Sequence, residues 1–584
     1  DVLRQIQTDN RNLSHERPSS FTAHPRHYGR SMPHGAVHPI IRGRTVILVD
    51  DGLATGMTME AAIRALWQLN PARVIVAVPA GSKETCDALR PLVDDVICGI
   101  TPEPFHPVGL WYEDFSQTTD EEVRELLSRP TVSDAAEAPK QPEACLDVVR
   151  HALHPLTGSA RDYDPLLERI GDAPLVLIGE ASHGTHEFYR ERAEITKRLI
   201  QEKNFRAVSV EADWPDAYRV NRYVRGVTED IDAYEALIDF RRFPTWMWRN
   251  TDVTDFVGWL RSHNDAQPSA TLKTGFYGLD LYSLRASAKA VLAYLEKVDP
   301  EAAQRARERY ACFDQFGEES QVYGFMTGLN LSKSCEQEVI DQLIELQRRA
   351  ADMAQRAGGI EEEGIFNAEQ NARVVKNAEE YYRSMFLQQV SSWNLRDRHM
   401  AETLEEVLKH IGREGERPKA VVWAHNSHIG DARATEMGKR GELNIGQMMR
   451  EKYGKDAVLI GFTTYHGTVT AASGWGGPAE RKHVRRGLLG SYEAMFHEVR
   501  PSRFVLTWKE GDSLANFLRE SRLERAIGVI YRPDTERQSH YFEARLADQF
   551  DAVLHFDETR SVKPLEYNAE WEAGEVPETF PAGL

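Results

Sequence analysis

The stretch Leu175-Val176-Leu177-Ile178-Gly179-Glu180-Ala181-Ser182-His183 decides the fold of the larger part of this chain. Four consecutive apolar residues that run into a polar turn are typical of a buried strand in a parallel sheet. Ala420-Val421-Val422-Trp423-Ala424 has the same form and runs into His425-Asn426-Ser427-His428. In open α/β sheets, ligands bind outside the carboxyl ends of the strands. We therefore expect these two distant segments to form one acid–base or hydrolytic site.

Two further apolar runs also end in acidic residues. Glu211 follows Ala207-Val208-Ser209-Val210, and Asp280 follows Gly275-Phe276-Tyr277-Gly278. A single Glu or His at a strand end is more often a cap than a catalyst. Burying polar groups at the ends of four strands would cost free energy unless the groups line a solvated cleft or pair with one another. The pattern therefore favours a functional site.

Arg192 is expected to face inward on the helix that follows the first motif. Phe188, Arg192, Ile195 and Leu199 are spaced so that they share one helical face. A buried guanidinium keeps its charge and needs an acidic partner, which Glu180 or Glu211 would supply. A purely structural ion pair is the alternative.

Composition limits the class of protein. The chain has 584 residues, and single cores stop growing at about 250–300 residues, so two or more domains are expected. A net charge of −19 repels phosphate backbones and argues against nucleic-acid partners. No run approaches the ~18–20 apolar residues that span a bilayer, so we expect no membrane partner. Five scattered cysteines without CxxC spacing favour free or buried thiols in a reducing cytoplasm.

The pattern of elements predicts an α/β protein with two domains. An apolar-poor stretch with two prolines, residues 133–143, is typical of a linker between a domain at 1–132 and a domain at 144–584. Beyond the linker, helices alternate with strand candidates, which indicates a large parallel-type sheet. The interval from about 284 to 415 has helical periodicity and predicts a helical insertion. The strand candidates are 175–178, 206–210, 275–279, 420–424, 457–461, 503–508, 526–531 and 552–556.

Three motifs in order resemble the erythromycin esterase family: Gly179-Glu180-Ala181-Ser182-His183-Gly184-Thr185-His186-Glu187-Phe188, Glu211-Ala212-Asp213-Trp214, and Trp423-Ala424-His425-Asn426-Ser427-His428. The resemblance covers about residues 145–570. It implies hydrolysis of an ester or lactone by an activated water, without metal or cofactor, as in macrolide antibiotic resistance. The implied functional residues are Glu180, His183, Arg192, Glu211, His425 and His428.

The chemistry of these residue types agrees with that implication. A histidine side chain in general has the right ordinary pKa for a general base near neutrality. His183 is therefore the candidate base, and Glu180 or Glu211 could orient its ring. Arg192, His425 and His428 are candidate donors to the developing oxyanion. Ser182 or Ser427 would be a nucleophile only with a base within hydrogen-bond reach. A Zn²⁺ or Mn²⁺ site built from the same His and carboxylate groups is the competing hypothesis.

The resemblance implies a type of reaction and does not identify the substrate, because a shared site does not transfer a substrate. Trp214, Trp246, Trp248 and Tyr465 are compatible with a cleft for a large apolar or glycosylated ester. Core packing is the alternative for each of these aromatic residues.

Near the N-terminus, the segment from Val46 to Thr58 resembles the PRPP-binding motif of type I phosphoribosyltransferases. The resemblance implies a phosphate or sugar-phosphate ligand held at Asp50, Asp51, Ala54, Thr55, Gly56 and Thr58. Only about 45 residues precede the motif, so we expect a partial domain that binds such a ligand at most.

Two alternatives to a hydrolase remain open. One is a ligand-sensing protein that binds a nucleotide or sugar phosphate and hydrolyses little. The other is a phosphoribosyltransferase whose missing half is supplied upstream or by another subunit. The sequence does not predict the oligomeric state.

Overall fold

The structure is a computed structural model of the chain. It describes residues 44–50, 52–53, 59, 60, 63, 66, 67, 71–101, 143–316, 320–328, 332–354, 360–385, 389–412, 416–567 and 571. The chain divides into two compact units, residues 1–130 and 131–584. The predicted linker at 133–143 lies almost wholly outside the described residues.

The first unit contains a small parallel sheet. Strands β1 (Thr45–Val49), β2 (Arg73–Ala80) and β3 (Asp95–Ile100) pair in the order β1-β2-β3, and helix α4 (Lys83–Leu89) joins the last two. Apolar residues such as Leu48, Val76 and Leu89 form its core. All three strands of this sheet are parallel.

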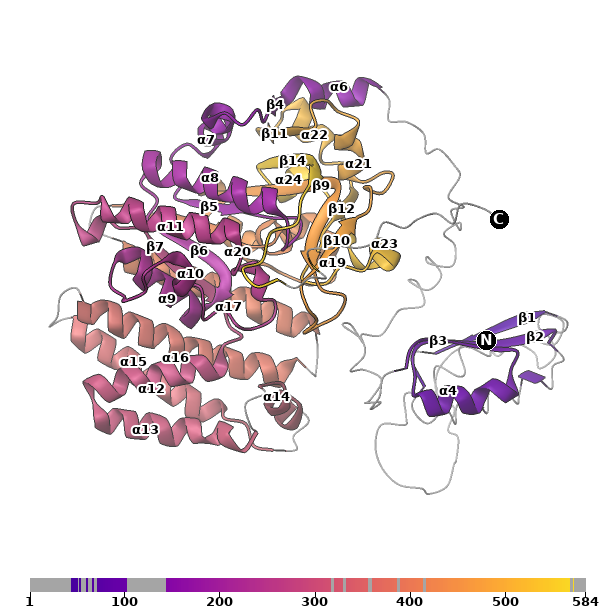
Figure 1. Ribbon diagram of the computed structural model, residues 1–584, viewed down its shortest axis with the longest axis horizontal. Helices are drawn as coiled ribbons and strands as arrows, with labels where there is room; N and C mark the ends of the chain where they lie inside the picture. The colour runs from indigo at the N-terminus through magenta and orange to yellow at the C-terminus, as the bar shows by residue number, and fades with distance from the viewer. Residues whose placement is uncertain are drawn as a thin grey trace. The chain divides into compact units, whose positions relative to one another are not determined.

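The second unit is built on a nine-stranded mixed sheet (Figure 1). Its order is β4-β11-β14-β9-β5-β8-β6-β7, with β10 added beside β9. The strands from β14 to β7 in this order are parallel, and β4, β10 and β11 pair antiparallel. Their bounds are β4 (Leu153–Pro155), β5 (Leu175–Ile178), β6 (Ala207–Asp213), β7 (Gly275–Asp280), β8 (Ala420–Trp423), β9 (Ala457–Ala471), β10 (Glu480–Val484), β11 (Arg503–Thr507) and β14 (Ala552–Thr559).

Helices cover both faces of this sheet, which explains the unbroken apolar runs of its strands. In β5, Val176 and Ile178 belong to one core cluster, whereas Leu175 and Leu177 belong to the other. Successive side chains of a strand point to opposite faces, so a strand buried on both sides must be apolar throughout. The first face packs against α7 (Asp164–Ile170), α8 (His186–Lys203), α9 (Trp214–Arg225), α10 (Ala233–Ala236) and α11 (Thr251–Asp265).

The second face packs against helices from remote parts of the chain. These are α6 (Glu143–Ala152), α17 (Gln389–Ile411), α20 (Ile445–Tyr453), α21 (Tyr492–His497), α22 (Ser513–Phe517) and α24 (Leu546–Gln549). The short helices α18 (Asn426–Ile429), α19 (Glu436–Lys439) and α23 (Glu536–Ser539) lie in connections. A separate ribbon, β12 (Arg522–Arg525) with β13 (Tyr541–Ala544), is antiparallel.

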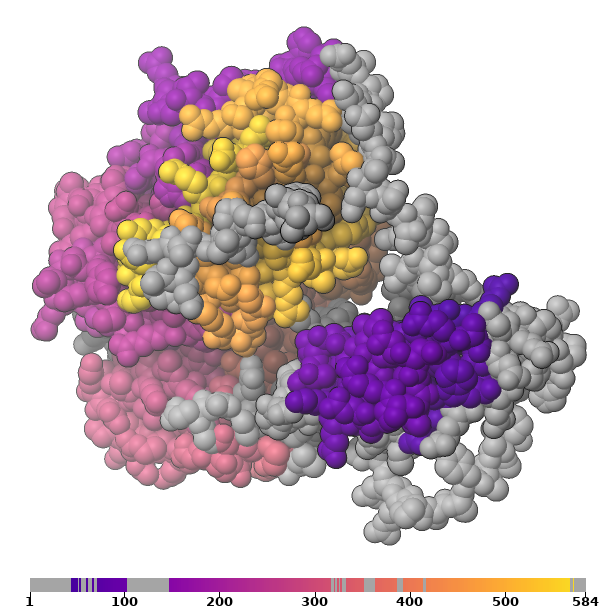
Figure 2. Space-filling view, turned by 45° about the vertical axis from the view of Figure 1, so that its right-hand side comes forward, coloured from indigo at the N-terminus to yellow at the C-terminus, as the bar shows by residue number. Residues whose placement is uncertain are grey.

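Most of the described residues between 284 and 412 are helical, as the sequence predicts. They form α12 (Leu284–Val298), α13 (Pro300–Tyr310), α14 (Ser320–Gly328), α15 (Glu336–Ala354), α16 (Ile360–Ser384) and α17. Helices α12, α13, α15 and α16 share a core of their own. Figures 1 and 2 show this pink block as one continuous side of the second unit.

Two sequence predictions are wrong in the structure. Residues 526–531 make isolated bridges through Ile527 and Ile530 and no regular strand. Cys312 and Cys335 form a disulfide, so the interpretation of the cysteines as free thiols fails for this pair. The fold of the helical block brings these two residues together although they are 23 positions apart in the sequence. The spacing of the cysteines along the chain does not predict this contact.

Several edge strands were absent from the prediction. β4, β10, β12 and β13 each have five residues or fewer and include charged or half-buried side chains. An edge strand needs no continuous apolar run, so it gives a weaker signal. Among the described residues, no helix has the length and apolar character required to cross a bilayer.

Candidate active site

The carboxyl ends of β5, β6 and β8 bring the predicted polar residues together. β8 lies between β5 and β6 in the sheet, and the Asn426 N–H donates to the Glu180 carbonyl over 2.8 Å. The rings of His183 and His425 are 4.8 Å apart between centroids. Glu211 accepts the backbone N–H of His425 over 2.9 Å. The two distant motifs therefore form one site.

Close backbone approaches explain the two glycines that flank the first motif. A Cβ on Gly179 would lie 2.2 Å from Asn426 Oδ1, and one on Gly184 would lie 1.8 Å from the Thr470 carbonyl. Either contact is far inside van der Waals range, so a side chain would force the turns apart. These glycines set the distance between the His183 turn and its neighbours.

Glu180 and His183 form a buried pair. His183 Nδ1 donates to Glu180 Oε1 over 2.9 Å, and Glu180 Oε2 lies 2.8 Å from Arg192 Nη2. The Arg192 side chain is fully buried between the rings of Tyr189 and Trp423, at 4.4 and 5.2 Å from their centroids. This confirms the inward Arg192 with Glu180 as its partner. With Nδ1 occupied, the remaining His183 nitrogen, Nε2, is the one able to accept a proton.

His425 is held as a neutral ring. Its Nδ1 accepts the N–H of Ser427 over 3.2 Å and caps helix α18. Burial, followed by the charge of His183, holds the pKa of His425 well below its usual range. The proton of the neutral ring is therefore on Nε2, which is buried near the Ala181 carbonyl without a well-aligned hydrogen bond.

His428 is fixed on several sides. Its Nδ1 donates to both oxygens of Asp397, over 2.9 and 3.0 Å, and Trp393 stacks on the ring at 4.5 Å. Nε2 lies 3.0 Å from Arg396 Nη1 and 3.4 Å from Glu211 Oε1. Burial lowers the pKa of His428, but Asp397 and Glu211 outweigh it and raise the pKa above the ordinary value.

Glu211 lies at the centre of the charged groups. Burial would raise its pKa, but the charges of His428, Arg396 and His183 outweigh burial and lower the pKa far below its usual range. Its Oε1 lies 2.7 Å from Arg396 Nη2. Glu211 is therefore a buried carboxylate that remains ionised.

The structure brings all six sequence-predicted residues to this place, and it adds others that sequence reasoning missed. Among the six, His183 is the most exposed at 7%, whereas Arg192 is fully buried. Arg396 and Asp397 come from helix α17, and Arg242 pairs with Asp213 over 2.7 Å. Asp213 stands in a quoted motif, but Arg396 and Asp397 stand in a charged stretch that has the composition of a solvated helix. No local signal marks them.

The aromatic residues proposed for a cleft mostly have another role. Trp214, Trp246 and Trp248 are 1–6% exposed and belong to the core clusters, whereas Tyr465 stacks on His497 at 3.8 Å. For the three tryptophans, the core-packing alternative holds. Trp393, which contacts His428, was not singled out.

The two serines have different surroundings. Ser182 Oγ bonds the Thr185 hydroxyl in its own turn. Ser427 Oγ lies 2.9 Å from His425 Nδ1, so a ring nitrogen is within reach. That nitrogen also caps the Ser427 N–H, and the low pKa of His425 makes it a poor base near neutrality.

Within the part of the chain that the structure describes, no group of three or more His, Cys, Asp or Glu is arranged to hold a metal ion. Of the predicted phosphate-binding residues, Asp50 follows β1, whereas Asp51, Ala54, Thr55, Gly56 and Thr58 lie outside the described residues.

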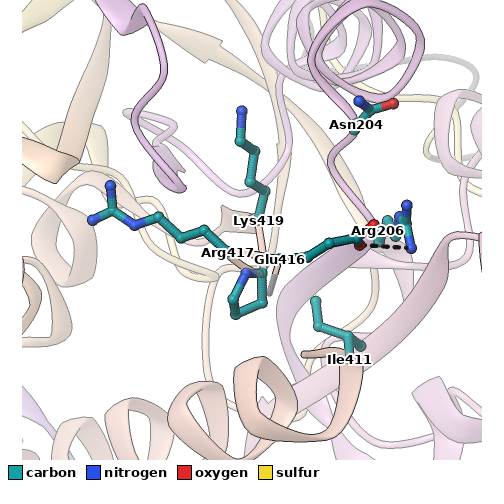
Figure 3. A pocket seen from close by; sticks show the side chains of 7 residues that line it. Asn204, Arg206, Ile411, Glu416, Arg417 and Lys419 are labelled. Carbon is teal, nitrogen blue, oxygen red and sulfur yellow. Dashed lines mark ion pairs between the residues drawn. The ribbon is translucent and has the colours of Figure 1, made fainter. Parts of the chain in front are cut away.

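A surface hollow lies at the opposite end of the strands (Figure 3). It is lined by Asn204, Arg206, Ile411, Glu416, Arg417, Pro418 and Lys419. Arg206 immediately precedes β6 and Lys419 precedes β8, so the hollow is a full strand length away from Glu211 and His425. Arg206 pairs with Glu416 over 3.4 Å, as Figure 3 shows. The hollow does not contribute to the site.

Comparison with known proteins identifies relatives of both units. An erythromycin esterase family model matches residues 200–559, and a phosphoribosyl transferase domain model matches residues 2–105. The first match contains Glu211, His425 and His428 and begins after Glu180, His183 and Arg192. An Escherichia coli protein named erythromycin esterase type II is 26% identical over 330 residues, which cover 53% of this chain and 73% of that protein.

Other similarities concern the first unit and the fold. A Mycobacterium tuberculosis protein named as a phosphoribosyl transferase is 39% identical over 89 residues, 15% of this chain and 20% of that protein. The chain thus spans only a fifth of that relative. A solved Bacillus cereus structure has a TM-score of 0.59 at 20% identity, covering 73% of this chain and all of that one. A solved erythromycin esterase mutant has a TM-score of 0.52 at 15% identity, covering 70% and 96%.

Proposed function

The chain belongs to the erythromycin esterase family, and we propose that its second unit hydrolyses a carboxylic ester or lactone with a water molecule activated by His183. The observation that carries this proposal is the Glu180–His183 pair beside His425, whose Nε2 makes no well-aligned hydrogen bond within the described residues. The rings that carry the proposed base and the proposed hydrogen-bond donor are 4.8 Å apart between centroids.

His183 is the general base in this mechanism. Glu180 accepts its Nδ1–H and is itself held by Arg192, so the ring presents Nε2 in a fixed orientation. A carboxylate behind an imidazole also stabilises the imidazolium that forms during the reaction. This arrangement supports Glu180 as the orienting residue and Arg192 as the residue that holds Glu180.

The reaction proceeds in two steps. His183 Nε2 removes a proton from water as the water oxygen bonds to the carbonyl carbon, whose π electrons move onto the carbonyl oxygen. The tetrahedral anion then collapses, the bond from carbon to the alcohol oxygen breaks, and the His183 imidazolium returns the proton to the leaving oxygen. The products are a carboxylic acid and an alcohol, joined in one molecule when the substrate is a lactone.

His425 is the donor that we assign to the oxyanion. Its Nε2–H is buried and makes no well-aligned hydrogen bond within the protein, and its ring lies 4.8 Å from that of His183. A preorganised donor of this kind contributes about 10²–10³-fold in rate. Arg192 is a weaker candidate, because its guanidinium is enclosed by Glu180, Tyr189 and Trp423.

The test is an ester and lactone panel that includes p-nitrophenyl esters and a macrolide. The parent is expected to turn over at least one member, whereas His183→Asn is expected to lower kcat by about 10²–10⁴-fold. His186→Asn is a matched control, because His186 also pairs with a carboxylate, Asp252, over 2.9 Å. Retention of full activity by His183→Asn would refute the assignment of the base.

Ser427→Ala separates this mechanism from a serine nucleophile. An activated water predicts that the variant keeps most of the activity and that no acyl-enzyme accumulates in the parent. Loss of turnover with a trapped acyl-enzyme in the parent would favour Ser427 instead. Metal analysis of the active protein tests the Zn²⁺ or Mn²⁺ alternative on the same samples.

The macrolide lactone is one proposed substrate, supported by the name of the Escherichia coli relative. A parent that hydrolyses small esters and leaves macrolides intact would keep the reaction type and reject this substrate. A parent that turns over nothing, yet binds a nucleotide or sugar phosphate, would favour the ligand-sensing alternative.

For the first unit, the phosphoribosyl transferase match supports binding of a phosphate or sugar phosphate at residues 50–58. Titration calorimetry with PRPP and with inorganic phosphate tests this proposal on the full chain. Binding that is unchanged in Thr55→Val would argue against the assigned residues.

A further inference from the structure

We propose that Arg396, from the helical insertion, is a positioning residue that holds Glu211 as an anion in its place between His425 and His428. The inference rests on the proposed function, because it assigns a role within that site. It makes helix α17 an electrostatic part of the active centre as well as one of its walls.

The guanidinium of Arg396 is aimed at Glu211 by a second carboxylate. Asp280, at the end of β7, accepts Arg396 Nε over 3.0 Å and Nη2 over 2.7 Å. Nη2 also reaches Glu211 Oε1 over 2.7 Å. The ring of Tyr282 lies 5.0 Å from the guanidinium carbon. Because the Arg fork is planar and rigid, the contact with Asp280 fixes the direction of the contact with Glu211.

Glu211 in turn holds the turn that carries two histidines. Its Oε2 accepts the His425 N–H over 2.9 Å, and its Oε1 lies 3.4 Å from His428 Nε2. The side chain of Glu211 is 4% exposed. A protonated Glu211 would attract these partners less strongly, so the anion is the form that keeps the His425 turn in register.

Titratable and charged groups from several elements surround Glu211 and its partners. They are His183 after β5, Asp280 at the end of β7, His425 and His428 after β8, and Arg396 and Asp397 on α17. An imidazole carries a charge only while it is protonated, whereas the guanidinium of Arg396 keeps its charge. Arg396 is therefore the counter-ion that remains when the histidines are neutral.

Removal of that charge changes the balance at Glu211. Burial favours the protonated acid, and it is opposed by His428, Arg396 and His183. Without the guanidinium of Arg396, less positive charge opposes the effect of burial, so the pKa of Glu211 rises. Activity that needs the ionised form would then be lost on the acid side at a higher pH than in the parent.

The experiment compares Arg396→Gln, Arg396→Lys and the matched control Arg398→Gln on the full chain. Arg398 lies two positions along the same helix with an exposed side chain. We expect Arg396→Gln to lower kcat by at least tenfold near neutrality and to move the acid limb of kcat/KM upward by at least one pH unit. Arg396→Lys keeps the charge without the fork, so its acid limb should stay near that of the parent while kcat falls.

Superimposable acid limbs for the parent and Arg396→Gln would overturn the proposal, as would an equal upward shift in Arg396→Lys or Arg398→Gln. Loss of folding in Arg396→Gln leaves the Lys variant as the deciding one. A Lys variant with an unmoved acid limb and reduced kcat supports the proposal, whereas a fully active one overturns the positioning role.

A stability readout separates failure of this proposal from failure of the proposed function. In the parent, the folded pKa of Glu211 lies below its unfolded value, so its contribution to stability is present above that unfolded value and is lost as pH falls. In Arg396→Gln the folded pKa is raised, and stability is lost as pH rises through it. We expect the difference in Tm between parent and variant to be larger at pH 7.5 than at pH 4.5. An equal difference at both pH values would overturn the proposal even if no ester is turned over.

Discussion

Replacing Arg192 by methionine tests the buried ion pair that supports the proposed base. Arg192 and Glu180 side chains are 0% and 2% exposed, and their charged atoms are 2.8 Å apart. Removing one partner of a buried pair leaves an uncompensated charge, which typically costs about 3–5 kcal/mol. Methionine fills most of the volume and keeps contact with the rings of Tyr189 and Trp423, so the loss should come mainly from Glu180.

The double variant Glu180→Gln with Arg192→Met removes both charges. It should recover at least ~2 kcal/mol relative to Arg192→Met alone, because no buried charge is then left without a partner. Arg198→Met is the matched control on the same helix, because Arg198 pairs with Glu202 over 2.6 Å near the surface. Partly exposed pairs of this kind contribute about 0–1 kcal/mol.

The free energy of unfolding is measured by urea denaturation followed through tryptophan fluorescence, with the four proteins at one pH and ionic strength. The reasoning is refuted if Arg192→Met is within ~1 kcal/mol of the parent, the cost of a surface pair. It is equally refuted if the double variant is no more stable than Arg192→Met. In that case Glu180 would not be a buried carboxylate that depends on Arg192.

Three further predictions concern stability. Burial, together with Asp213 and Asp239, raises the pKa of Asp216 to about 8, so stability is lost as pH rises from the unfolded value of about 3.9 towards 8. Asp216→Asn should therefore be more stable than the parent at pH 8 and close to it at pH 4. An equal effect of the substitution at both pH values would contradict the raised pKa. Asn204 ends α8 with a φ of +58°, in the left-handed region. In thermal melts, Asn204→Gly should therefore be about as stable as the parent, whereas Asn204→Ala should lose about 1 kcal/mol of stability. Similar losses of stability in both variants would argue against the left-handed conformation. The Cys312–Cys335 disulfide links residues 23 positions apart. Its removal in Cys312→Ser should lower the stability by about 2–4 kcal/mol in the same assay. An unchanged melting curve would mean that the disulfide does not form in solution.

Local patterns in the sequence were sufficient to predict the framework of the site. The strands at 175–178 and 420–423 are buried on both faces, so they must be continuously apolar, and the polar residues that follow them are conspicuous. The helical period likewise placed Arg192 on the inward face, and its partner is Glu180, one of the two that the sequence offered. Both inferences depend on burial, because a buried strand or helix face requires apolar residues at neighbouring positions of the sequence.

The tertiary structure alone decided which charges compensate one another. Arg396 and Glu211 are 185 positions apart, and Asp397 reaches His428 from the same helix. In the sequence these two α17 residues have the composition of a solvated helical face. Electrostatic pairing acts through space between groups whose separation is set by the packing of whole helices, and nothing in a residue's immediate neighbours encodes that separation. The sequence therefore determined where the candidate site residues lie along the chain, and the packing of the helical insertion against the sheet determined which charged groups pair with them.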